Sequence, residues 1–151
     1  MHSQSLWSFA LACYAEPVIE PLLLAAQDQG HSVCVLLTAA WLERRGCAWS
    51  AARQAQLSHS AAQWNTPIIE PLRALRIQWK SHVDDLPSLS PLREQLKALE
   101  LAAEQQLLQT LEQQGLAWET ASQPSHWLDA MGLSVELIGP LRHAAERAYL
   151  A

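Results

Sequence analysis

A six-residue phrase occurs twice in this chain, as PVIEPL at Pro17–Leu22 and as PIIEPL at Pro67–Leu72. Proline lacks an amide hydrogen and fixes φ at a helical value, so it is tolerated in the first turn of a helix and disfavoured inside one. Each copy is therefore expected to begin a helix, the second of them after a Thr66 cap. Because the residues that follow the two copies do not align, the phrase indicates a recurring helix start and not a duplicated domain.

Residues that favour helices outnumber those that favour strands. Leu, Ala and Gln occur 26, 24 and 14 times, whereas Val, Ile and Thr together number 14. This usage predicts an all-α chain, a single irregular helical bundle of five to seven helices over residues 1–151. Its core is expected over about 3–115, followed by a helical tail at 116–151.

Capping residues and prolines place the expected helices. They run from Ser3 or Ser5 to about Ala15, from Pro17 or Pro21 to Gln29, from the Ser32 cap to Arg45 before Gly46, from Ser50 to Trp64, from Pro67 to about Trp79, and from the Ser90 cap to Gln114, with a last one at 140–150. The helix after Ser90 is the longest, and its Glu- and Gln-rich face predicts a position on the outside of the bundle. Its apolar stripe is Leu92, Leu96, Leu99, Ala103, Leu107 and Leu111.

The charge and the cysteines limit the partners and the compartment. The formal net charge is −5, half of the residues are hydrophobic and 17% are charged, which excludes a disordered chain and a general polyanion binder. A nucleic-acid partner is not expected, because the sequence pI is near 5.6 and phosphate neutralisation needs a basic surface. Cys13, Cys34 and Cys47 are expected to be buried free thiols, and no apolar run approaches the roughly 20 residues of a membrane span. The sequence thus predicts a cytoplasmic protein.

Motifs for catalysis are absent from the sequence. The five glycines form no phosphate loop, and no nucleophile elbow occurs. His31 and Cys34 are three positions apart, but no second pair follows at zinc spacing. We therefore expect no metal and no cofactor, and the sequence favours a protein without enzymatic activity while leaving an enzyme open.

Tryptophan is unusually frequent, with seven residues beside one Phe and two Tyr. The favoured interpretation is that the rings fill the core, while the alternative is a pocket for a small apolar ligand lined by Trp7 and Trp41. Asp28 lies in the last turn of its helix, where a negative charge is unfavourable, so a partner such as His31 or an arginine is expected. In the alternative function, a binder or converter of such a ligand, Asp28 and His31 lie at the mouth. A cavity of a few hundred cubic ångströms would favour this function.

Arg73, Arg76 and Lys80 are spaced three and four apart, which places them on one face of their helix. This face could bind an acidic partner or phosphates, but we favour its pairing with the acidic helix after Ser90. The favoured function is a non-catalytic interaction or regulatory module with a protein partner of unknown identity, compatible with a homo-oligomer. Its binding surface is either this basic face or the apolar seam between the first helices and the tail.

Several short segments together resemble a known family. They are Ser5–Ala10 with Tyr14 and Ala15, Leu24 to Asp28, Gly30, Val33, Leu36 to Leu37, Trp41 and Leu42, Pro71 to Arg73, Leu75 and Arg76, Leu92 and Arg93, Lys97 and Glu100. Over roughly residues 5–110 the chain resembles a small proteobacterial family of uncharacterised proteins, domain of unknown function 2390. The resemblance implies a bacterial, cytoplasmic, helical protein, and it brings no activity, cofactor or catalytic residue.

Overall fold

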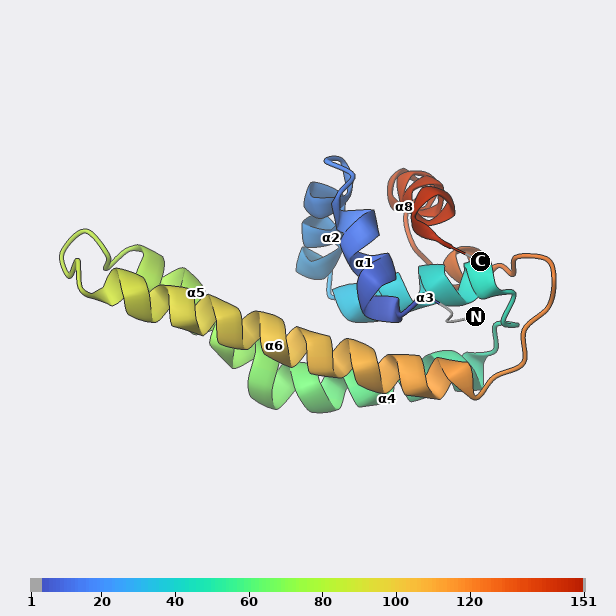
Figure 1. Ribbon diagram of the computed structural model, residues 1–151, viewed down its shortest axis with the longest axis horizontal. Helices are drawn as coiled ribbons and strands as arrows, with labels where there is room; N and C mark the ends of the chain where they lie inside the picture. The colour runs from blue at the N-terminus through green and yellow to red at the C-terminus, as the bar shows by residue number, and fades with distance from the viewer. Residues whose placement is uncertain (1–3, 151) are drawn as a thin grey trace.

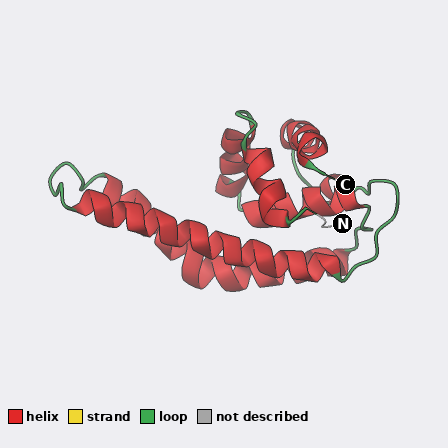
Figure 2. Ribbon diagram, viewed as in Figure 1, coloured by secondary structure: helices red, strands yellow, loops and turns green. Residues whose placement is uncertain are grey.

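The computed structural model describes residues 4–150, and in this range the chain is all-α, as expected (Figure 2). The helices are α1 Leu6–Tyr14, α2 Ile19–Asp28, α3 Val33–Arg45, α4 Ala51–Trp64, the π-helical segment η1 Asn65–Ile69, α5 Glu70–Lys80, α6 Leu89–Leu116, α7 Trp127–Ala130 and α8 Val135–Ala148. Apart from the four-residue α7, the described residues form seven α-helices, within the expected range.

The helices form two layers (Figure 1). One layer is a long hairpin in which α4, η1 and α5 run along α6, and the other contains α1, α2, α3 and α8. The longest helix, α6, exposes its Gln-rich face to solvent as expected, while its other faces pack against α5, α4, α3 and α1. Only its first half projects with α5 beyond the second layer, and we call this projection, residues 70–99, the arm.

The two copies of the repeated phrase behave differently. The first begins a helix as expected, since α2 starts at Ile19, two residues after Pro17. The expectation for the second copy is wrong, because the chain continues from α4 through η1 into α5 and Thr66 caps nothing. Inside an α-helix the Pro67 ring would clash with the carbonyl four residues earlier, and the wider π turn accommodates it.

Serine caps and one glycine fix the boundaries of α1, α3 and α4. The side chains of Ser5, Ser32 and Ser50 each accept a hydrogen bond from the amide three residues later. Gly46 ends α3 with φ +75°, and an added Cβ there would lie 2.3 Å from the carbonyl oxygen of Ala121. The glycine therefore both terminates the helix and lets the tail approach.

The apolar stripe of α6 is confirmed only in part. Leu96, Ala103, Leu107 and Leu111 are buried as expected. Leu92 and Leu99 are instead 52% and 56% exposed, because they lie on the arm, where the second layer does not cover them. The helix also begins at Leu89, one residue before its expected Ser90 cap.

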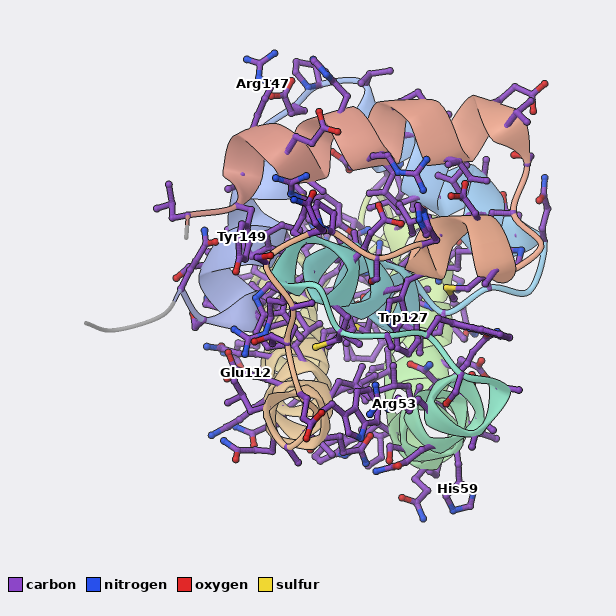
Figure 3. The ribbon with its side chains drawn as sticks, turned by 90° about the vertical axis from the view of Figure 1, so that its right-hand side faces the viewer. Arg53, His59, Glu112, Trp127, Arg147 and Tyr149 are labelled. Carbon is purple, nitrogen blue, oxygen red and sulfur yellow. The ribbon has the colours of Figure 1, made fainter. Side chains whose placement is uncertain are left out.

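The tail completes the core. Trp127 is fully buried, donates its indole N–H to the carbonyl of Cys47 at 2.9 Å and stacks on Trp118 with 6.0 Å between ring centroids. Figure 3 shows Trp127 in the middle of the molecule, while His59 and Arg147 lie at opposite edges. The first helices and the tail share one core, so the seam between them is packed with buried apolar residues.

Two further expectations concern the thiols and the membrane. All three cysteines are buried and free, as expected. Among residues 4–150 no single helix is long and apolar enough to cross a membrane. Taken together, α1 and α2 are long and apolar enough, but the chain bends by 106° between them.

Candidate functional site

A cavity of about 660 Å³ lies where the second layer meets the base of the arm. Its walls come from α1, the second half of α2 with the turn after it, the start of α3, the π segment with α5, and the middle of α6. The π segment contributes Asn65, whose amide donates to the hydroxyl of Ser32 at 3.2 Å. This hydrogen bond joins the π segment to the N-terminal cap of α3, and both residues line the cavity.

Two arginines of α5 form ion pairs with two glutamates of α6 in the wall of this cavity. The Nε of Arg76 donates to both carboxylate oxygens of the buried Glu100, at 2.8 and 3.0 Å. Arg73 donates to Glu104 at 3.3 Å and also to the side chain of Gln27, whose amide oxygen turns toward the guanidinium. The Nε of Arg93 donates to the carbonyl of Arg76 at 3.0 Å and holds α5 in register with α6.

Burial and neighbouring carboxylates raise the pKa values of three groups in this wall, those of Glu104, Cys34 and Tyr14. Burial raises the pKa of Glu104 above its ordinary value of 4.5, Glu100 adds to the rise and Arg73 opposes it. Burial, and then the charge of Glu104, raise the pKa of the Cys34 thiol to about 12. The same two causes, in the same order, raise the pKa of the Tyr14 hydroxyl. Cys34 and Tyr14 therefore keep their protons at neutral pH, and neither is an activated nucleophile.

The remaining wall is aromatic and aliphatic. The half-buried Trp7 and the partly exposed Tyr14 line it from α1. Leu11, Leu24 and Leu101 also line it, although 50%, 53% and 52% of their surfaces are exposed to solvent. These leucines place an apolar rim at the mouth of a cavity whose interior contains ion pairs.

Comparisons with known proteins identify a family and no activity. The family described as "Protein of unknown function (DUF2390)" matches residues 5–111. The chain belongs to this family. Neither the curated proteins nor the solved structures contain a match to it. The matched part of the DUF2390 protein includes every residue that lines the cavity, whereas the tail lies beyond the match.

The structure brings together most of the site residues that the sequence singles out. Five of them line the cavity of this DUF2390 protein, namely Trp7, Asp28, His31, Arg73 and Arg76. Trp41 does not, because it is fully buried in the core with the Arg45 guanidinium 4.6 Å from its ring centroid. Lys80 lies exposed at the end of α5, away from the cavity. The basic face is thus divided, and its two arginines make the favoured pairing with α6.

The expected partner of Asp28 is not found. In the part of the chain that the structure describes, Asp28 makes no ion pair, neither with His31 nor with an arginine. Its side chain is exposed, so solvent screens the unfavourable interaction with the C-terminus of α2. The carboxylate is therefore available at the mouth of the cavity.

Sequence reasoning missed the acidic half of the site. The sequence indicates the acidic helix as the partner of the arginines but singles out none of its glutamates, and in the structure Glu100 and Glu104 both line the cavity. A signal was present, because Glu100 follows Leu96 by four positions and precedes Ala103 by three, which places it inside the apolar stripe. A carboxylate in such a stripe needs a partner, and Arg76 supplies it. No group of three or more metal-ligating side chains occurs within residues 4–150.

Proposed function

We propose that this DUF2390 protein binds a small organic molecule in the cavity between α1, α2, α3, α5 and α6. The observation that carries the proposal is the cavity itself, about 660 Å³ in volume, with an apolar rim and polar groups inside. Ligand sites in proteins are typically hollows of roughly 300–1,000 Å³ that combine apolar walls with a few placed polar groups. The cavity thus supports the ligand-binding alternative, with Trp7 and Tyr14 as its aromatic residues in place of Trp7 and Trp41.

Blocking the mouth tests this function. Leu11→Trp and Leu101→Trp add large side chains at positions that are about half exposed, so both variants are expected to fold. Leu116→Trp is the matched control, because Leu116 is 44% exposed and does not line the cavity. In ligand-observed NMR with a library of small organic molecules, binders of the wild type are expected to bind the control and to lose at least about tenfold in affinity for the blocked variants. Binding that is unchanged by both blocked variants, or a library without binders, would overturn the proposal.

A second function, self-association through the arm, is supported by its exposed apolar residues. No residue of α5 is buried, and Ile77, Leu92 and Leu99 are 60%, 52% and 56% exposed. Ile68 and Leu75 on one side, and Leu92 and Leu99 on the other, are seven positions apart, which is the spacing of a helical seam. Ile68, Leu75 and Leu99 also line a shallow groove of about 460 Å³ between α5 and α6. A second copy of the arm carries the same two stripes, so two arms could close into four antiparallel helices.

The oligomeric state tests this second function. The wild type is expected to be a dimer in size-exclusion chromatography with light scattering, because pairing would remove these leucines from water. Leu92→Glu with Leu99→Glu is expected to yield a monomer of unchanged helicity. Leu116→Glu, an equally drastic change on the same helix beyond the arm, should leave the dimer intact. A wild type that is monomeric at its highest soluble concentration would refute the pairing.

A further inference from the structure

The walls of the cavity carry more negative than positive charge. They contain the four carboxylates of Asp28, Glu70, Glu100 and Glu104 and the two guanidinium groups of Arg73 and Arg76, a formal charge of −2 with His31 neutral. Both guanidinium groups already have acceptors on the protein, since Arg76 binds Glu100 and Arg73 binds Glu104 and Gln27. An anionic ligand would compete with these pairs, whereas a cationic one would find carboxylates in excess.

Two of the carboxylates have no cationic partner. Among the described residues, neither Asp28 nor Glu70 makes an ion pair. Glu104 has a partner in Arg73, but at 3.3 Å through a single nitrogen, in contrast to the closer contacts of Glu100. The rise in the pKa of Glu104 agrees with this, because it shows that Arg73 does not offset burial and the repulsion from Glu100. The negative charge that lines the cavity is thus incompletely compensated within the protein.

The rest of the wall suits a cation with an apolar body. Trp7 and Tyr14 supply aromatic rings, whose faces attract cations. Leu11, Leu24 and Leu101 supply aliphatic surface at the rim. The buried Cys34 also lines the cavity and adds to its apolar wall.

From these observations we propose that the cavity binds an organic amine, with its ammonium group beside carboxylates of the lining and its apolar part against the aromatic and leucine side chains. This inference rests on the ligand-binding function proposed above and specifies the class of ligand. Of the alternatives, a carboxylate would be repelled by the excess negative charge, and an uncharged molecule would leave that charge uncompensated. The ammonium group of such a ligand would add a second positive charge beside Glu104, next to that of Arg73.

Three probes that share one apolar body test the class of ligand. They are 4-phenylbutylamine, 4-phenylbutan-1-ol and 4-phenylbutanoate, titrated into the full chain by calorimetry at neutral pH and low salt. The amine is expected to bind at least about tenfold more tightly than the alcohol, and the carboxylate most weakly. The advantage of the amine over the alcohol should shrink as salt is added, because ions screen the charge. Equal affinities, or tightest binding of the carboxylate, would overturn the proposal.

Variants of the carboxylates localise the effect. Glu104→Gln is expected to reduce amine affinity by roughly tenfold and to leave the affinity for the alcohol unchanged. Asp28→Asn provides a second variant in which folding is not at risk, because Asp28 is exposed, and it should reduce amine affinity by a smaller factor. Glu94→Gln is the control, since Glu94 lies on the same helix, has a side chain that is 66% exposed and does not line the cavity. Loss of amine binding in the control as great as in Glu104→Gln would refute the assignment.

The outcomes separate the class of ligand from the function. If the alcohol and the amine bind equally and Leu11→Trp abolishes both, the cavity is a ligand site for apolar molecules and the amine proposal is wrong. If none of the three probes binds, the amine proposal is also wrong, and the NMR library with the blocked variants decides the binding function independently. Amine binding that survives Leu11→Trp and Leu101→Trp would place the amine elsewhere and refute the proposal for this cavity.

Discussion

Trp127→Ala is expected to lower the free energy of unfolding by about 3–5 kcal/mol, the range found for removal of a large aromatic side chain from a core. Trp127 is fully buried, stacks on Trp118 and donates its indole N–H to the carbonyl of Cys47. Its removal leaves a cavity and an unpaired carbonyl in the interior, and both effects act in the same direction. For a domain of this length the melting temperature should fall by about 10 °C.

Trp49→Ala is the matched control for this loss of stability. Trp49 is 38% exposed and its indole N–H donates to the side chain of Gln54 at the surface. Chemical denaturation of both variants, followed by circular dichroism, should show a loss of at most about 1 kcal/mol for Trp49→Ala. Similar stability for the two variants would mean that the tail does not share the core of α3, contrary to the structure.

The fold class follows from the sequence because it depends on local preferences. Few strand-forming residues, serine caps and Gly46 suffice to place α1, α3 and α4. The repeated phrase marks the limit of such reasoning, since the same six residues begin α2 but lie within the continuous run of α4, η1 and α5. Proline disfavours a regular α turn and does not distinguish a break from a π turn. That choice depends on packing against α6, which the local sequence does not contain.

Only some of the site residues were predictable from the sequence, and their arrangement was not. Spacing alone places Arg73 and Arg76 on one face, and charge alone suggests the acidic helix as their partner. That this pairing lines a cavity with Trp7 depends on how α1 and the turn after α2 meet the arm, which is a tertiary contact. Trp41 illustrates the same limit, because a tryptophan at a helix end has the same local pattern whether it borders a cavity or fills a core.

Glu43→Gln is expected to lower the free energy of unfolding by about 2–3 kcal/mol, because it removes the charge of a carboxylate that is 2% exposed and accepts from three donors. Two of these donors are the Nε and Nη2 of Arg142 on α8, at 2.8 and 3.0 Å, and the third is the backbone N–H of Leu128 on α7, at 3.2 Å. Glu43 therefore joins α3 to both helices of the tail. The hydrogen bond to this carboxylate is also the first cause of the raised pKa of Arg142.

Two further variants determine how much of this loss belongs to the pair. Asp129→Asn, at the other carboxylate that binds Arg142, should change stability by at most about 1 kcal/mol, because the side chain of Asp129 is 50% exposed. The double variant Glu43→Gln with Arg142→Met should recover part of the loss, since it removes the guanidinium that the first change leaves without a buried counter-charge. A fully additive loss in the double variant would show that Glu43 and Arg142 act independently. Coupling between them would instead identify this ion pair as one link, beside the shared core, that fixes the tail beyond the family match to the matched helices.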